Sequence, residues 1–129
     1  MVGTEVTYLD THVLVHLFFG ELNKLGAAAR RAIDRDDLLA SAASVLELEL
    51  LHEIGRMKPT GSKLVATLAD DIGLRVCHLP FRMVVEHALT EGWTRDPFDR
   101  LIVANAKAAG APLVTKDQRI HDHYSRALW

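Results

Sequence analysis

Short apolar runs alternate along the chain with longer segments in which apolar residues recur every three or four positions. The first pattern is typical of buried strands, and the second of helices that pack one face against a sheet. The runs that predict strands cover residues 6–9, 37–41, 75–79 and 111–115, with an edge strand at 126–129. The segments that predict helices cover residues 12–19, 24–35, 44–55, 61–73, 80–91, 97–110 and 117–124.

The order of these elements predicts the fold class. Strands that alternate with helices pair in parallel, because each helix carries the chain back before the next strand begins. A parallel sheet has to be covered by helices on both faces. We therefore expect an α/β protein in which residues 1–129 form a single three-layer α/β/α domain around a central parallel sheet of four to five strands.

Composition narrows the class of protein without deciding its chemistry. No apolar run approaches the ~20 residues that a membrane-spanning helix needs, and no signal peptide is expected from the first residues. Cys77 is the single cysteine, which excludes an internal disulfide and suits a reducing cytoplasm. The formal net charge of −2 excludes binding of nucleic acid by bulk positive charge alone. A nucleic-acid substrate would therefore need metal ions or local basic patches.

Four acidic residues recur where predicted strands end or predicted helices begin. Asp10 directly follows the first strand, and Glu47 lies in the first turn of the helix after the second. Asp99 lies in the first turn of the helix before the fourth strand, and Asp117 follows that strand. In a parallel α/β sheet, strand carboxyl ends and helix amino ends share the edge that binds ligands. We therefore predict that the four carboxylates converge at one edge.

Clustered carboxylates imply a bound cation, because they repel one another unless a cation neutralises them. Oxygen-only ligation favours the hard divalent ions Mg²⁺ and Mn²⁺. Such ions lower the pKa of a bound water and stabilise in-line displacement at phosphorus, so phosphoester hydrolysis is the implied chemistry. A zinc site is disfavoured: His12 and His16 are four residues apart, but no cysteine or well-spaced third ligand follows.

Helix capping accounts for each acid taken alone. Asp96 followed by Pro97 is typical of an N-cap with proline at the first helical position. Ser44 and Glu47 fit a capping box, and Asp117 could cap the last helix. Capping does not account for the position of all four acids at one edge, so we favour a metal site.

Basic and apolar residues flank the acids. The basic candidates for contacts with a phosphate backbone are Arg95, Arg100, Lys116 and Arg119. Arg100 could equally pair with a carboxylate. The leucines around Glu47 are predicted to face the core rather than a cofactor; they are Leu46, Leu48, Leu50 and Leu51.

Four segments, taken in order, match the motifs of one family. They are "LDTHVLV" with Asp10, "SAASVLELELL" with Glu47, "RDPFDRLIVANA" with Asp96 and Asp99, and "LVTKDQRI" with Thr115 and Asp117. Together they resemble the PIN-domain ribonucleases, and within them the VapC-type toxins of bacterial and archaeal toxin–antitoxin pairs. The resemblance spans almost the whole chain.

The resemblance implies a Mg²⁺- or Mn²⁺-dependent endoribonuclease that acts in the cytoplasm as the toxin of a type II toxin–antitoxin system. It assigns catalysis and metal binding to the four acids, with supporting roles for Thr11 and Thr115. Asp96 would touch the metal, hold Arg95 or Arg100, or only cap the helix. Family members usually form homodimers, and a VapB-like antitoxin typically places a C-terminal peptide, often with a basic side chain, in the acidic groove.

Other functions would use the same residues. A metal-dependent phosphatase or DNA nuclease needs the same acids, and comparing RNA, DNA and phosphomonoesters would distinguish them. A phospho-acceptor signalling domain shares the length, the layers and an aspartate after the first strand, and acetyl phosphate would label it. Intact acids at all four positions argue against a catalytically inactive binding module.

Overall fold

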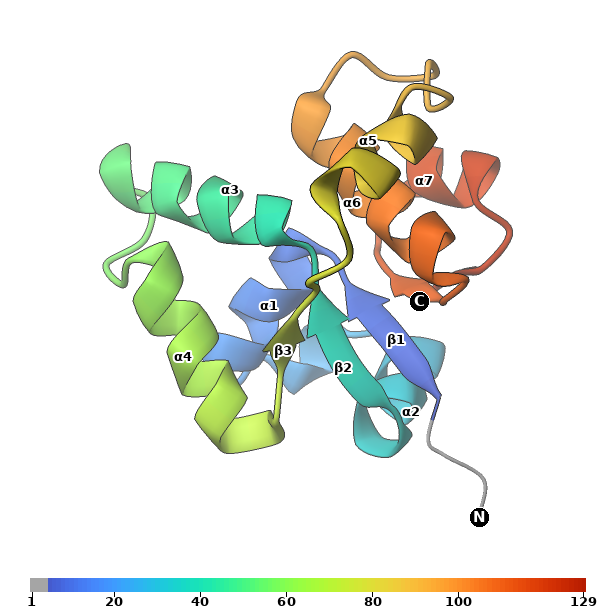
Figure 1. Cartoon of the computed structure of the whole chain (residues 1–129). Coiled ribbons are helices and arrows are strands. Elements are labelled where there is room, and N and C mark those ends of the chain that lie inside the picture. Colours follow the sequence, from blue (N-terminus) through green and yellow to red (C-terminus); the bar gives the residue numbers. More distant parts are fainter. Residues whose placement is uncertain (1–4) are drawn as a thin grey trace.

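Five parallel strands form the centre of the computed structural model, which describes residues 5–129. The strands are β1 (Val6–Leu9), β2 (Asp37–Ala40), β3 (Arg75–Val76), β4 (Leu113–Val114) and β5 (Ala127–Leu128). They lie in the order β3-β2-β1-β4-β5, and every neighbouring pair is parallel (Figure 1). The predicted parallel sheet of four to five strands is confirmed.

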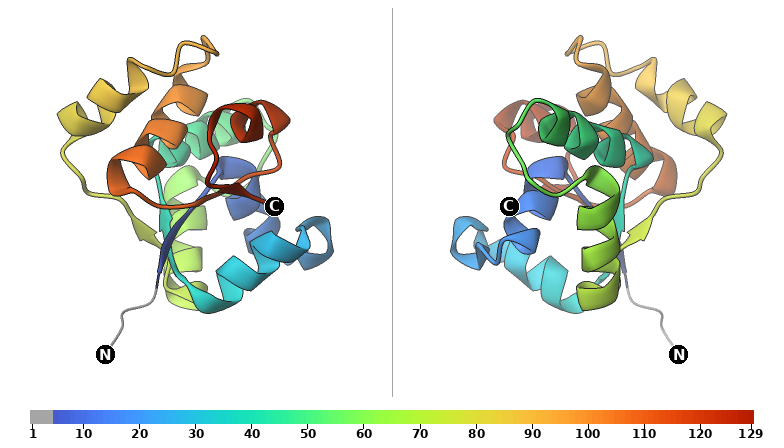
Figure 2. Two further views of the ribbon diagram at one scale, coloured as in Figure 1. Left: turned by 90° about the vertical axis from the view of Figure 1, so that its right-hand side faces the viewer. Right: turned by 90° about the vertical axis from the view of Figure 1, so that its left-hand side faces the viewer.

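Helices cover both faces of this sheet. They are α1 (Thr11–Phe18), the short 3-10 helix η1 (Leu22–Lys24), α2 (Ala27–Arg35), α3 (Ala42–Glu53), α4 (Gly61–Ile72), α5 (Phe81–Ala88), α6 (Pro97–Ala109) and α7 (Gln118–His123). The helices α1, α2 and α4 lie on one side of the sheet, and α5 and α6 lie on the other (Figure 2). None of the helices in residues 5–129 combines the length and hydropathy needed to span a lipid bilayer.

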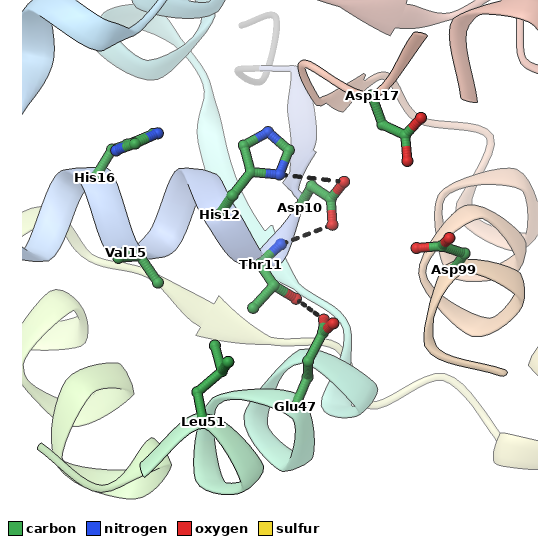
Figure 3. Close-up of a pocket in the computed structure, with 9 residues that line it drawn as sticks. All are labelled: Asp10, Thr11, His12, Val15, His16, Glu47, Leu51, Asp99 and Asp117. Atoms are coloured by element: carbon green, nitrogen blue, oxygen red, sulfur yellow. Dashed lines mark hydrogen bonds and ion pairs between the residues drawn. The ribbon is translucent and has the colours of Figure 1, made fainter. Parts of the chain in front are cut away.

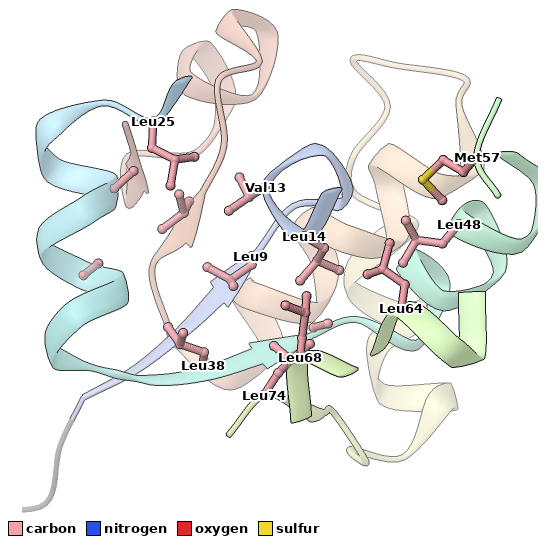
Figure 4. Packing of buried hydrophobic residues seen from close by; sticks show 14 residues of the cluster. Leu9, Val13, Leu14, Leu25, Leu38, Leu48, Met57, Leu64, Leu68 and Leu74 are labelled. Atoms are coloured by element: carbon pink, nitrogen blue, oxygen red, sulfur yellow. The ribbon is translucent and has the colours of Figure 1, made fainter. Parts of the chain in front are cut away.

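Alternate residues of the central strand enter two separate cores. Leu9 packs with Leu14 and Leu64 on the side of α1 and α4 (Figure 4). Tyr8, its neighbour, packs with Ile102 of α6 on the opposite side. Burial on both faces follows from the period of two in a strand, and it accounts for the continuous apolar runs in the sequence.

The register of the sheet brings several polar side chains to one edge. Leu9 pairs with Ala40 of β2 and with Val114 of β4. The residues that follow these three positions, Asp10, Ser41 and Thr115, therefore leave the sheet side by side. The backbone N–H of Asp10 also donates to the carbonyl oxygen of Val114 at 3.0 Å.

Some predicted boundaries are wrong because contacts between distant segments decide them. The helix expected over 24–35 is divided into η1 and α2 around Gly26. A Cβ at Gly26 would lie 2.5 Å from the carbonyl carbon of Trp129, so Trp129, just after β5, packs directly on this break. The strands expected over 37–41, 75–79 and 111–115 are shorter, since each chain segment turns away from the sheet to reach its next helix.

The observed start of α3 contradicts the predicted capping box. The side chain of Ser41 accepts a hydrogen bond from the backbone N–H of Ala43 at 3.1 Å, which makes Ser41 the N-cap. Ser44 is therefore a buried residue inside the helix, and Glu47 lies in its second turn rather than its first. The predicted pairing of Ser44 with Glu47 as a capping box is wrong.

The leucines around Glu47 do not all face the core. Leu48 is fully buried and Leu51 packs against the core, but 56% of Leu46 and 38% of Leu50 are exposed. The expectation that all four are core residues is wrong for Leu46 and Leu50, which lie on a different face of α3.

Candidate active site

A cavity of about 270 Å³ opens at the carboxyl edge of the sheet. All four predicted acids line it, and they come from the end of β1, from α3, from α6 and from the start of α7 (Figure 3). The residues around the cavity are Asp10, Thr11, His12, Val15, His16, Glu47, Leu51, Asp99 and Asp117. Segments far apart in the sequence therefore contribute carboxylates to one site.

Asp10 is the most tightly held of these acids. Its Oδ1 accepts from the backbone N–H of Thr11 at 2.7 Å, which also caps α1. Its Oδ2 accepts from the hydroxyl of Thr115 at 2.7 Å. The Thr115 Oγ1 in turn accepts from the backbone N–H of Asp117 at 3.0 Å. Thr115 thus links two of the acids.

Thr11 holds the second acid. Its hydroxyl donates to Oε1 of Glu47 at 2.5 Å and orients that carboxylate toward the cavity (Figure 3). Burial raises the pKa of Glu47, and the charges of Asp10 and Asp96 raise it further, while the hydrogen bond from Thr11 opposes the change. The carboxylate therefore lies in surroundings that disfavour its charge unless a cation is near.

Asp99 has the most perturbed titration in the site. It lies in the first turn of α6, as predicted. Burial and then the negative charges of Asp96, Asp10, Asp117 and Glu47 raise the pKa of Asp99 from 3.8 to about 7. Among residues 5–129, no lysine or arginine forms an ion pair with any of the four acids that line the cavity. Their negative charge is left uncompensated by the described side chains.

The donor chemistry suits a hard divalent cation. Across the described range, no three His, Cys, Asp or Glu side chains are already gathered as a complete ligand set. Mg²⁺ does not require one, because it usually keeps several waters and takes only one or two carboxylates. Carboxylate oxygens that lack a cationic partner and share one cavity therefore fit such an ion.

Asp96 acts as a helix cap in this arrangement. Its Oδ1 accepts from the backbone N–H of Phe98 at 2.8 Å and of Asp99 at 3.3 Å. It is exposed and is not among the residues that line the cavity. It forms no ion pair with Arg95 or Arg100, so the alternative in which Asp96 holds one of these arginines is wrong. The capping role is supported, and contact of Asp96 with a metal stays a prediction.

The three arginines near the acids fasten the segment before α6. Arg95 donates to the carbonyl of Gly92, Arg100 to that of Thr94 and Arg119 to that of Trp93, at 2.8, 2.8 and 2.7 Å. The alternative in which Arg100 pairs with a carboxylate is therefore wrong. Each guanidinium has five N–H groups, so these single contacts leave donors for a phosphate. Lys116 is exposed and lines a second hollow beside Asp117.

His12 is a site residue that the sequence suggested only as a zinc ligand. Its Nε2 accepts from the backbone N–H of Lys116 at 2.9 Å. The ring hydrogen is therefore on Nδ1, which faces Oδ2 of Asp10 at 3.6 Å (Figure 3). Burial lowers the pKa of His12 and favours this neutral form. The available sequence signal was its place two residues after Asp10, in the first turn of a helix at the ligand-binding edge.

Comparisons with known proteins agree with this geometry. A family model described as the PIN domain matches residues 7–126. The protein named Ribonuclease VapC22 from Mycobacterium tuberculosis is 37% identical over 121 residues, which cover 89% of each chain.

Solved structures with the same fold include VapBC2 from Rickettsia felis bound to a promoter DNA fragment, with a TM-score of 0.64, 15% identity and coverage of 96% and 97% of the two chains. A toxin–antitoxin complex from Klebsiella pneumoniae has a TM-score of 0.60, 13% identity and coverage of 95% and 96%. The match over nearly the whole chain, together with the identity to the mycobacterial protein, shows that this chain belongs to the PIN domain family and to its VapC group.

Proposed function

We propose that this protein is a divalent-metal-dependent endoribonuclease and the toxin of a type II toxin–antitoxin system in the cytoplasm. The observation that carries the proposal is the convergence of four carboxylates on one cavity in a chain of the PIN family. The name of the mycobacterial relative, a ribonuclease, supports RNA as the substrate. The neighbouring structures, which are toxin–antitoxin complexes, support the biological role.

In this proposal each residue of the site has a defined task. Asp10, Glu47, Asp99 and Asp117 would hold one or two Mg²⁺ or Mn²⁺ ions, directly or through waters. When bound, such an ion lowers the pKa of water and offsets negative charge on the phosphate oxygens. Thr11 orients Glu47, and Thr115 sets Asp10 relative to Asp117. One of the carboxylates accepts a proton from the attacking water.

An exposed apolar stripe on α3 supports an antitoxin as partner. Leu46, Leu50 and Ile54 recur at four-residue intervals, with exposed fractions of 56%, 38% and 67%. At 100° per residue, Ile54 lies about 20° from Glu47 around the helix axis, whereas Leu46 lines a separate hollow with Ser62 of α4. A VapB-like segment that covers the stripe would bring a basic side chain to the uncompensated acids.

A second apolar surface supports the expected homodimer. Phe81 at the start of α5 and Leu89 just after its end are exposed large apolar side chains that lie about 80° apart around the helix axis, so they share one side of α5. We assign this surface to a second copy of the chain, and light scattering of the purified protein tests the assignment.

The function is tested by incubating the antitoxin-free protein with total bacterial RNA and mapping new 5′ ends. Parallel reactions contain Mg²⁺, Mn²⁺ or EDTA, and an Asp99→Asn variant serves as control. Discrete cuts that require the metal and are missing from the control are the expected result. Matched DNA and phosphomonoester substrates are run alongside. Faster turnover of either would replace the ribonuclease proposal by a DNA nuclease or a phosphatase.

We expect His12→Ala to slow RNA cleavage about tenfold. This is the lower end of the loss of activity that follows when a residue in contact with a metal ligand is removed. The variant loses the acceptor for the Lys116 N–H, so the loop that carries Asp117 loses one of its hydrogen bonds to the α1 segment. The Mn²⁺ affinity of the purified variant should fall with the rate. His16→Ala, which removes a histidine of the same cavity that contacts neither Asp10 nor Lys116, is the matched control. Equal Mn²⁺ affinities in His12→Ala and the wild type would show that His12 has no positioning role.

A further inference from the structure

The loop before α6 carries an aromatic side chain that the proposed reaction does not use. Trp93 stacks on His123 of α7, with ring centroids 4.9 Å apart and planes inclined by only 6°. The guanidinium carbon of Arg119 lies 5.5 Å from the centroid of the Trp93 ring. These three side chains form one aromatic and cationic surface, which we call the Trp93 stack.

Hydrogen bonds and a buried ion pair fix the position of Trp93 in the stack. The indole N–H of Trp93 donates to Oε1 of Glu91 at 2.9 Å, and the carbonyl of Trp93 accepts from Arg119 at 2.7 Å. Glu91 is itself only 1% exposed, and its Oε2 pairs with Nζ of Lys107 at 2.7 Å. A ring that is already immobilised loses little conformational freedom when a ligand packs on it, so its surface is preorganised for binding.

Part of the stack lies on the same helix as one of the acids of the cavity. Asp117 lines that cavity and is the N-cap of α7, while Arg119 and His123 lie further along the same helix. At 1.5 Å per residue, His123 is about 9 Å along the helix axis from Asp117. Figure 1 shows the orange loop before α6 beside α7, and the hydrogen bond from Arg119 to Trp93 joins the two segments.

The exposed groups of the stack are those that bind unpaired nucleotides. Arg119 and His123 are exposed and Trp93 is half-buried, so the imidazole that stacks on Trp93 also has surface open to solvent. In the described part of the chain, Arg119 forms no ion pair. The acidic neighbour on α7, Asp122, accepts from Gln118. Aromatic faces beside a free guanidinium bind the bases and phosphates of single-stranded nucleic acids.

We propose that the Trp93 stack is a binding site for an unpaired base of the RNA beside the cleaved phosphodiester. The base packs on the exposed face of His123, and Arg119 contacts the adjoining phosphate. This inference rests on the proposed ribonuclease function and adds a preference for single-stranded segments, because the bases of a duplex are stacked on one another and cannot pack on a side chain.

Binding is measured in an Asp99→Asn background, so that the RNA stays intact, with Mn²⁺ present. The probe is a short, unstructured, fluorescein-labelled RNA of mixed sequence, used single-stranded and annealed to its complement. We expect His123→Ala to weaken single-strand binding about tenfold, the loss of one base stack, with duplex binding unchanged. His123→Phe should retain the affinity. His87→Ala removes an exposed histidine of α5 that lies outside the stack and should change nothing.

Kinetics, metal affinity and stability distinguish base binding from a purely structural role of the stack. In the otherwise wild-type enzyme, His123→Ala should raise KM with little change in kcat, and both Mn²⁺ affinity and melting temperature should stay unchanged. A parallel loss of Mn²⁺ affinity would mean that the stack only fastens α7 and Asp117, which overturns the inference. Unchanged single-strand affinity also overturns it and leaves the surface to a protein partner. Absence of any RNA cleavage by the wild type would instead overturn the proposed function.

Discussion

We expect Asp99→Asn to slow RNA cleavage at least about 100-fold, which is the upper end of the loss caused by removing an outer partner of a metal ligand. Asparagine keeps the shape of the side chain but cannot supply the charge that holds a divalent ion. Asp99 accepts no described hydrogen bond that the fold needs, and its backbone N–H remains capped by Asp96. We therefore expect the fold to be retained, and initial rates of cleavage at a mapped site measure the loss.

The same substitution separates catalysis from stability. Burial and then the neighbouring acids raise the pKa of Asp99 to about 7, so its charge opposes folding in the metal-free protein. Because Asp99 is partly exposed, solvent screening reduces the effect to about 1 kcal/mol. Metal-free Asp99→Asn should therefore melt above the wild type near neutral pH, although it is inactive. Asp34→Asn, an exposed acid of α2, is the matched control. Wild-type cleavage rates in Asp99→Asn would remove this residue from the mechanism.

Removal of the divalent ion should abolish cleavage and make stability depend on pH through the acidic site. The folded-state pKa of Asp99 lies above its unfolded value of 3.8, so the folded state binds more protons between about 4 and about 7. The contribution of Asp99 to stability is therefore present at low pH and is lost as pH rises through about 7. The raised pKa of Glu47 acts in the same direction.

Chemical denaturation of the metal-free protein across this pH range measures the effect. His12 has the opposite effect on the stability of the folded protein. Burial lowers the pKa of His12, so its contribution to stability increases as pH rises. The difference between the wild type and Asp99→Asn isolates the contribution of Asp99, since His12 is common to both. Mn²⁺ should stabilise the wild type increasingly as pH rises, because it binds the ionised carboxylates. A pH-independent difference between the two proteins would contradict the assignment.

Local signals predicted the elements and the position of most of the acids. The run at residues 6–9 gave β1 with its observed ends, and the Asp96-Pro97 pair placed the start of α6 and therefore Asp99 in its first turn. These signals succeed because strand burial, proline geometry and N-capping act over a few residues. Convergence of the acids on one edge followed from the parallel topology that this alternation of elements requires.

Contacts between distant segments account for the errors at residue level. Ser41 rather than Ser44 caps α3, because the chain leaves β2 one residue earlier than the apolar run indicates. Leu46 and Leu50 stay exposed because the described segments packed against α3 leave these two side chains largely uncovered. The sequence identifies a side chain as apolar, but it does not say whether another segment of the folded chain will cover it.

The sequence by itself therefore determined the α/β class, the parallel sheet and the family to which the motifs point, since these depend on local periodicity and on spacing along the chain. Only the tertiary structure decided how the site is held together. The link from Thr115 to Asp10, the contact of His12 with Lys116 and the Trp93 stack each join residues that are distant in sequence. Such contacts exist only after the sheet has set the positions of its connecting segments, so no local pattern encodes them.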